Sequence, residues 1–168
     1  MHPLKYAVVE RERRWLLQAV PPTAGEVVLV EDWYVHGTRL RLRRVTSADG
    51  TVERKLGHKV RVGDGGPAEV ACTSLYLDDA EWDLLAGLPS DRLTKRRTRG
   101  AHGGALVAVD EFVGDLAGLV LGEIDRRDGP EVEPPVEWRV VREVTDEEAF
   151  TGAALARRCS PPAYDEHA

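Results

Sequence analysis

The stretch that decides the fold is Glu10-Arg11-Glu12-Arg13-Arg14-Trp15-Leu16-Leu17, which directly follows the apolar run 6–9. In an extended strand, successive side chains point to opposite faces, so Glu10, Glu12 and Arg14 share one face. Two neighbouring carboxylates on one face of a sheet repel each other unless a cation lies between them. A solvated face on an edge strand is the ordinary explanation, and the charges on the other strands decide whether it holds.

The composition predicts one compact soluble domain. The chain has 168 residues, of which 42% are apolar and 31% are charged, which suits a single hydrophobic core. The net charge of −6 argues against a general binder of nucleic acids or of anionic membranes, although local basic patches stay possible. We therefore expect no nucleic-acid partner.

Membrane insertion and secretion are not predicted. No apolar run approaches the roughly 20 residues of a membrane span, and the first ten residues are mixed and partly charged, unlike a signal peptide. The two cysteines, Cys72 and Cys159, form neither a zinc-site spacing nor a disulfide framework. We expect a reduced, cytoplasmic protein with no membrane partner.

The rest of the chain alternates short strand patterns with turn signals. After the first strand, alternation predicts strands at residues 27–30 with 32–35, 38–45, 51–62, 69–77, 92–99, 106–113, 119–126 and 137–144. Asp78 or Asp79 can cap a helix that ends near Leu88. The capping-box sequence at residues 145–148 predicts a last helix to about Arg158. Residues 1–158 then form one domain, and 159–168 form a loose tail.

Several strands place charges of one sign on one face and apolar side chains on the other. The same-face groups are Arg39, Arg41 and Arg43; Lys55, Lys59 and Arg61; Lys95, Arg97 and Arg99; and Glu123 with Asp125. An ordinary solvated surface mixes charges of both signs, whereas these basic strands carry almost only lysine and arginine.

A closed barrel would explain this pattern, because its apolar outer face would pack under helices and its charged face would line the interior. Such an interior is stable only with bound counter-ions: basic groups would bind a polyanion, and carboxylates would hold its divalent metal. A chain of phosphates with Mg²⁺ or Mn²⁺ fits both requirements. Alternation alone, however, does not distinguish a closed barrel from a curved open sheet.

The chain resembles the CYTH superfamily, also called triphosphate tunnel metalloenzymes, whose ExExK signature is similar to residues 10–14. Other similar segments follow in order along most of the chain. They are Arg39-Leu40-Arg41, the basic strand with Lys55, Lys95-Arg96-Arg97, Val109-Asp110-Glu111-Phe112, Gly118 to Asp125, and Glu143-Val144-Thr145.

The resemblance implies an α+β fold, an eight-stranded antiparallel β-barrel that forms a tunnel, with flanking helices. Carried over by position, the metal ligands would be Glu10, Glu12 and Glu123, with Asp125 as a helper. The phosphate-binding set would be Arg14, Arg39, Arg41, Lys55, Lys95 and Arg97. Glu12 and Arg14 would take part directly in metal-assisted attack on a terminal phosphorus, with Mg²⁺ or Mn²⁺ as cofactor.

Three departures from the family pattern bear on the chemistry. Arg14 stands where the signature has lysine, which keeps the charge but changes reach and geometry. Neutral residues, including Cys72 and Ser74, occupy the fourth strand, where many hydrolytic members carry alternating glutamates. Thr151-Gly152 stands where the family has an asparagine. The neutral fourth strand puts the activation of water in question.

The predicted function is divalent-metal-dependent hydrolysis of inorganic triphosphate or of a triphosphate-bearing small molecule. A class IV adenylate cyclase is an alternative, although the sequence shows no nucleoside pocket. A module that binds triphosphate or polyphosphate with weak or no catalysis is a third hypothesis, favoured by the neutral fourth strand. The sequence leaves the natural substrate and the oligomeric state open.

Overall fold

The structure is a computed structural model, and it describes residues 6–22, 25–63, 66–125 and 129–163. Its strands are β1 (Val8–Leu17), β2 (Glu26–Val35), β3 (Leu40–Thr46), β4 (Val52–Arg61), β5 (Glu69–Tyr76), β6 (Ser90–His102), β7 (Ala105–Phe112), β8 (Val120–Asp125) and β9 (Val140–Glu143). The helices are α1 (Asp79–Ala86), the 3₁₀ turn η1 (Gly114–Leu116), the 3₁₀ turn η2 (Glu148–Phe150) and α2 (Gly152–Leu155).

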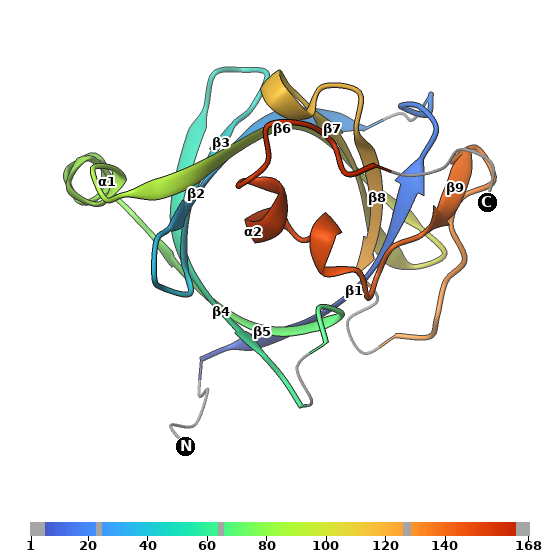
Figure 1. The fold of residues 1–168 in the computed structure, drawn as a ribbon, viewed down its shortest axis with the longest axis horizontal. Coiled ribbons are helices and arrows are strands. Elements are labelled where there is room, and N and C mark those ends of the chain that lie inside the picture. Colours follow the sequence, from blue (N-terminus) through green and yellow to red (C-terminus); the bar gives the residue numbers. More distant parts are fainter. Residues whose placement is uncertain (1–5, 23–24, 64–65, 126–128, 164–168) are drawn as a thin grey trace.

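All strand pairs are antiparallel, and the sheet closes on itself. Its order is β5-β4-β3-β2-β6-β7-β8-β1-β9, with an additional pairing between β1 and β5. In that pairing Val8 lies opposite Cys72 and Glu10 lies opposite Val70. Strand β9 pairs with the same edge of β1 as β5 does, but further along, opposite residues 15–17. The expected eight-stranded antiparallel barrel is therefore confirmed, with β9 as an extra strand beside it (Figure 1).

The outer face of the barrel is apolar where other segments cover it. Helix α1 packs its buried Trp82 edge-to-face against Trp33 of β2, with ring centroids 5.0 Å apart. The segment before β9 covers another part, where Trp138 packs against Trp15 and Gly122. A Cβ at Gly122 would lie 2.3 Å from the Trp138 ring, so only glycine admits this contact. Burial of these large rings outside the barrel leaves the opposite face of the same strands for polar groups.

The segment after β9 that contains η2 and α2 enters the barrel instead of covering it. In Figure 1, α2 lies within the ring of strands. Phe150 and Leu155 are buried there in a cluster with Leu16, Phe112 and Leu121. The apolar side chains of this segment therefore close part of the barrel interior.

The predicted helix from a capping box at Thr145 to about Arg158 is wrong in its start and its length. The Thr145 hydroxyl accepts a 2.9 Å hydrogen bond from the Arg14 backbone and donates one of 2.6 Å to Glu143. These contacts use the hydroxyl at the β1 edge, so it does not cap a helix. Thr151 caps α2 instead, accepting a hydrogen bond from the Ala154 backbone.

Other boundaries differ less. The predicted last strand, 137–144, shortens to β9, because Trp138 turns back to donate its backbone N–H to Pro135. The helix predicted to begin at Asp78 or Asp79 is confirmed, with Asp78 as a capping-box residue. Residue 126 of the predicted strand 119–126 and residues 164–168 of the predicted tail lie outside the described residues. No helix in the described ranges is both long and apolar enough to cross a membrane.

Candidate functional site

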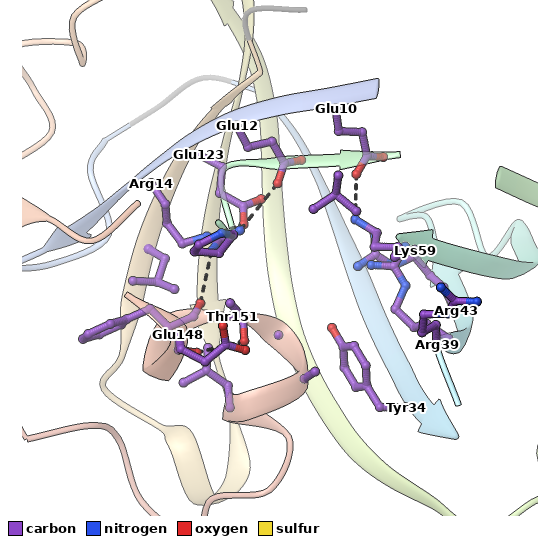
Figure 2. Close-up of a pocket in the computed structure, with 18 of the residues that line it drawn as sticks. Glu10, Glu12, Arg14, Tyr34, Arg39, Arg43, Lys59, Glu123, Glu148 and Thr151 are labelled. Atoms are coloured by element: carbon purple, nitrogen blue, oxygen red, sulfur yellow. Dashed lines mark hydrogen bonds and ion pairs between the residues drawn. The ribbon is translucent and has the colours of Figure 1, made fainter. Parts of the chain in front are cut away.

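A cavity of about 360 Å³ occupies the barrel interior, bounded by strands and by the C-terminal segment (Figure 2). Charged side chains dominate its described lining. The cations are Arg14, Arg39, Arg41, Arg43, Lys59, Arg61, Lys95, Arg97 and Arg157. The carboxylates are Glu10, Glu12, Glu123 and Glu148. So many cations around a small space create a positive potential that would attract a polyanion.

The two faces of β1 separate as the alternation predicts. Glu10, Glu12 and Arg14 line the cavity. On the other face, Arg11 pairs with Glu69 at 3.1 Å and Arg13 pairs with Glu143 at 2.8 Å. The ordinary explanation of a solvated edge strand is therefore wrong, because β1 is paired on both edges and its acidic face lines a cavity.

The structure places five of the six expected phosphate-binding residues in the cavity lining, and it also places there three cations of β3 and β4 and Arg157 of the C-terminal segment, which have no role in the sequence prediction. Arg14, Arg39, Arg41, Lys95 and Arg97 line the cavity as expected. Arg43, Lys59 and Arg61 line it as well. They share the faces of Arg41 and Lys55 in the sequence pattern, so the alternation was the signal that could have found them.

Lys55 lies elsewhere. It is opposite Arg43 in register, but its ammonium pairs with Glu53 at 2.7 Å and lies 4.8 Å from the centre of the Tyr76 ring. It is not among the described residues that line the cavity. The alternation placed Lys55 and Lys59 on the same face, and only the barrel geometry separates them in depth.

Asp125 is the second expected residue that the cavity does not include. It lies directly opposite Glu12 in the register of β1 and β8, yet only Glu123 of β8 is among the described lining carboxylates. Three of the four expected metal ligands, Glu10, Glu12 and Glu123, therefore come together around the cavity.

Buried ion pairs hold the cations at the inner end of the cavity in place. Asp110 of β7 accepts hydrogen bonds of 2.5 Å from Lys95 and 2.7 Å from Arg97 Nε. Arg97 also binds Glu123. Burial disfavours the charged form of Lys95 and, together with neighbouring Arg97, lowers its pKa. Asp110 belongs to a segment that is similar to the family but has no role in the sequence prediction; in the structure it aligns two of the cations that are expected to bind phosphate.

A second buried carboxylate, Asp32 of β2, holds two arginines of β3 in place. It accepts two hydrogen bonds of 2.7 Å from Arg43, and Arg41 lies 3.6 Å away. Beside it, burial and the negative charge of Asp32 raise the pKa of Tyr34 to about 12, so the Tyr34 hydroxyl keeps its proton at neutral pH.

Glu123 and Glu10 are held as anions by cationic neighbours. Burial opposes the charge on Glu123, but Arg97 and Arg14 outweigh it and hold its pKa well below the usual range. Arg14 Nε donates to Glu123 at 3.0 Å. Burial likewise opposes the charge on Glu10, yet Lys59, at 2.6 Å, lowers the pKa of this carboxyl.

The pKa of Glu12 shifts in the opposite direction from those of Glu10 and Glu123. Its ion pair with Arg14 is long, at 3.5 Å. Burial and the neighbouring Glu123 raise its pKa. A carboxylate whose charge is so poorly compensated, next to a second one, is suited to receive a further cation.

The donor chemistry of this group fits Mg²⁺ or Mn²⁺, since carboxylate oxygens are the ligands that these metals prefer. Among the described residues, however, no three histidine, cysteine or acidic side chains converge closely enough to hold a metal ion. Metal binding would therefore require Glu10 and Glu123 to exchange part of their contacts with Lys59, Arg14 and Arg97.

Comparison with solved structures identifies the fold. A crystal structure described as the hypothetical protein NE1496 is 25% identical, with a TM-score of 0.58 over 91% of this chain and 99% of the other. A second structure, described as the inorganic triphosphatase NE1496, is 23% identical, with a TM-score of 0.57 over 88% and 93%. The chain has the fold of the CYTH superfamily.

A third structural neighbour is described as a putative adenylate cyclase from Bacillus halodurans. It is 12% identical, with a TM-score of 0.51 over 71% of this chain and 81% of the other. No protein-family model matches the chain, and no curated protein sequence matches it. The resemblance seen in the sequence is thus confirmed by fold.

In this CYTH barrel, β5 contributes no carboxylate to the inner face. Val70 and Cys72 lie opposite the cavity-lining Arg61 and Lys59, and residues directly opposite share a face. Cys72 Sγ contacts Ser74 Oγ at 3.7 Å. β5 is the strand on which the family pattern has alternating glutamates. The structure therefore confirms that neutral residues occupy this part of the inner face.

The C-terminal segment adds residues that sequence reasoning missed. Glu148 and Thr151 line the cavity (Figure 2), and Arg14 Nη1 donates to the Phe150 carbonyl at 3.3 Å. The sequence pattern predicts Glu148 only as part of the capping box at residues 145–148. No local pattern indicates that the chain turns inward after β9.

Proposed function

We propose that this protein hydrolyses the terminal phosphate of a triphosphate, with inorganic tripolyphosphate as the first substrate to test. The observation that carries the proposal is the lining of the cavity: cations from β1, β3, β4 and β6 surround one space that also contains Glu10, Glu12 and Glu123. The description of NE1496 as an inorganic triphosphatase supports this choice among anions.

The chain's own residues would bind and orient the phosphates. Arginine offers bidentate contacts to phosphate oxygens, which suits Arg39, Arg41 and Arg43, whereas Lys59 and Lys95 act as point charges. Asp32 and Asp110 fix the directions of Arg43 and Arg97 before substrate arrives. Such preorganised positive charge stabilises the charge that develops on the phosphoryl oxygens and on the leaving group.

In the proposed reaction, a water oxygen forms a bond to the terminal phosphorus while the bridging phosphorus–oxygen bond breaks. Tripolyphosphate gives diphosphate and orthophosphate; one proton of the water stays on orthophosphate and the other is released. Glu10, Glu12 and Glu123 would hold Mg²⁺ or Mn²⁺, which supplies further charge neutralisation and orients the phosphates.

The test is phosphate release from inorganic tripolyphosphate with Mg²⁺ or Mn²⁺, run beside calorimetry on the same protein. Chelation of the metal should stop turnover, and Glu12→Gln should lower kcat/KM by about a hundredfold or more. Glu111→Gln is a matched control, because Glu111 is on the outer face and pairs with exposed Arg96 at 3.4 Å. Full activity of Glu12→Gln would contradict the proposed role of the carboxylates.

One observation favours a second candidate, a module that binds triphosphate or polyphosphate without turnover. The inner face of β5 is neutral at Val70, Cys72 and Ser74, so no carboxylate from this strand can activate water. Tight binding of tripolyphosphate without phosphate release under either metal would favour this module and reject hydrolysis of this substrate. ATP and thiamine triphosphate would then be tested, with formation of cyclic AMP from ATP as the sign of a cyclase.

A further inference from the structure

Glu148 is the cavity carboxylate that the proposed metal and phosphate chemistry does not use. It comes from η2, whereas Glu10, Glu12 and Glu123 come from β1 and β8. Its side chain is 61% exposed and forms an ion pair with Arg61, the last residue of β4, which is 45% exposed. Figure 2 shows Glu148 on the C-terminal segment, near Thr151 and away from Glu10 and Glu12. The pair therefore lies at the mouth of the cavity.

The wall of the interior beside Lys95 and Arg97 is apolar on β2 and β3. Val28 and Val30 lie opposite Arg97 and Lys95 in register, so they share the inner face with these cations. With Val45 they form a cluster in which each residue is no more than 4% exposed. A phosphate chain bound at Lys95 and Arg97 meets apolar side chains on this wall, whereas Arg39 and Arg61 line the cavity towards its mouth, so additional units should point towards the mouth.

The exposed charges at the mouth are of both signs. Arg39, Arg61 and Arg157 are cations, and Glu148 is the exposed carboxylate among the described lining residues. A solvent-exposed ion pair such as Arg61–Glu148 contributes little to stability. Arg61 is 45% exposed, so it does not depend on a carboxylate to offset burial. The stronger consequence of Glu148 is a fixed negative charge on the exit path of a polyanion, next to a cation that a phosphate would otherwise bind.

Resting on the function proposed above, we propose that Glu148 is a specificity-determining residue that limits the substrate to short phosphate chains. A chain whose charges end within the cavity keeps its contacts with the inner cations and stays clear of Glu148. A longer chain brings further negative charge to the mouth, where Glu148 repels it and also occupies Arg61. Substrates with more than three linked phosphates should therefore be disfavoured relative to tripolyphosphate.

The experiment compares kcat/KM for tripolyphosphate and tetrapolyphosphate, at low and high salt, in the wild type and three variants. Glu148→Gln should raise the tetrapolyphosphate-to-tripolyphosphate ratio by roughly three- to tenfold at low salt, and less at high salt, since one screened charge pair at such distances changes affinity by about this amount. Glu147→Gln is the matched control, because Glu147 pairs with Arg142 and does not line the cavity. It should leave the ratio unchanged.

Arg61→Gln separates a charge effect from a merely structural one. If the ion pair only held η2 in place, Arg61→Gln and Glu148→Gln would change the kinetics in the same direction. The proposal requires opposite directions: Arg61→Gln should lower kcat/KM for tetrapolyphosphate, whereas Glu148→Gln raises it. An unchanged ratio in Glu148→Gln, or changes in the same direction, would overturn the proposal. A wild type that neither binds nor hydrolyses either anion would overturn the proposed function itself, and this inference with it.

Discussion

Asp32 accepts two parallel hydrogen bonds of 2.7 Å from the Nε and Nη2 atoms of Arg43, inside the barrel and 1% exposed. One residue earlier, Glu31 accepts two bonds of 2.7 Å from Arg44 on the outer face. The two pairs have the same geometry on the same two strands and differ in burial. Their comparison isolates what the barrel interior does to an ion pair.

Asp32→Asn should lower the free energy of unfolding by about 3–5 kcal/mol, because it leaves the Arg43 charge buried without its partner. Glu31→Gln should cost less than about 1 kcal/mol, because the Arg44 side chain is partly exposed to water, at 36%. Denaturant unfolding of both variants measures the difference. Equal losses in the two variants would contradict an interior that excludes water from the Asp32–Arg43 pair.

The same pair predicts an acid dependence of stability. Burial opposes the charge on Asp32, but Arg43 and Arg41 outweigh it and hold its pKa below the ordinary value of 3.8. A group with a lowered folded-state pKa stabilises the protein above its unfolded pKa and loses that contribution as pH falls. Stability should therefore decline below about pH 4, and more steeply in the wild type than in Asp32→Asn. Parallel curves from pH 6 to 2 would contradict this assignment.

Lys59→Ala and Lys55→Ala test which lysine of β4 binds phosphate. Lys59 lines the cavity and pairs with Glu10, whereas Lys55 pairs with Glu53 outside the lining. Lys59→Ala should raise KM for tripolyphosphate about tenfold or more, as expected for loss of a charge-assisted contact. Lys55→Ala should change KM less than about twofold. A larger increase of KM in Lys55→Ala than in Lys59→Ala would instead support Lys55 as the phosphate-binding lysine, as the sequence predicts.

Gly152→Ala tests the seating of α2 in the barrel. A Cβ at this position would lie 2.0 Å from the Tyr34 hydroxyl oxygen, so the substitution should destabilise the protein by about 1–3 kcal/mol. Gly66→Ala is the control, because its Cβ would meet no atom within 4 Å. In Gly152→Ala/Tyr34→Phe the nearest clashing atom is removed, so part of the loss should be recovered. A stable Gly152→Ala would show that α2 does not pack against Tyr34.

Magnesium binding should depend on pH through Glu12. Burial and Glu123 raise the pKa of Glu12, so a larger fraction of Glu12 is protonated in mildly acidic solution than for an ordinary glutamate. Because metal binding needs the carboxylate, Mg²⁺ affinity should increase as pH rises through this pKa, with proton release. Calorimetry in two buffers of different ionisation enthalpy measures the release. The release should be smaller in Glu12→Gln, and an unchanged release would exclude Glu12 as its source.

Period-two alternation was enough to predict the inner faces of β1, β3 and β6, because a strand's two faces follow directly from the order of its residues. Glu12 and Arg14 face the cavity for this reason, as do Arg39 and Arg41. Depth along the barrel is not encoded in the same way. Lys55 and Lys59 are equivalent in alternation, and only the strand register places one of them in the cavity and the other beyond it.

The order of residues alone was enough to predict that the charged faces of several strands come together. Successive side chains of a strand point to opposite faces, so each of these strands has one apolar side and one ionic side. The tertiary structure decided that β1 pairs with β5, which turns an open sheet into a barrel. It also decided that the chain after β9 turns inward and brings Glu148 to the cavity. Both outcomes depend on contacts between residues far apart in the chain, whose formation is governed by the packing of the whole interior and not by any local pattern.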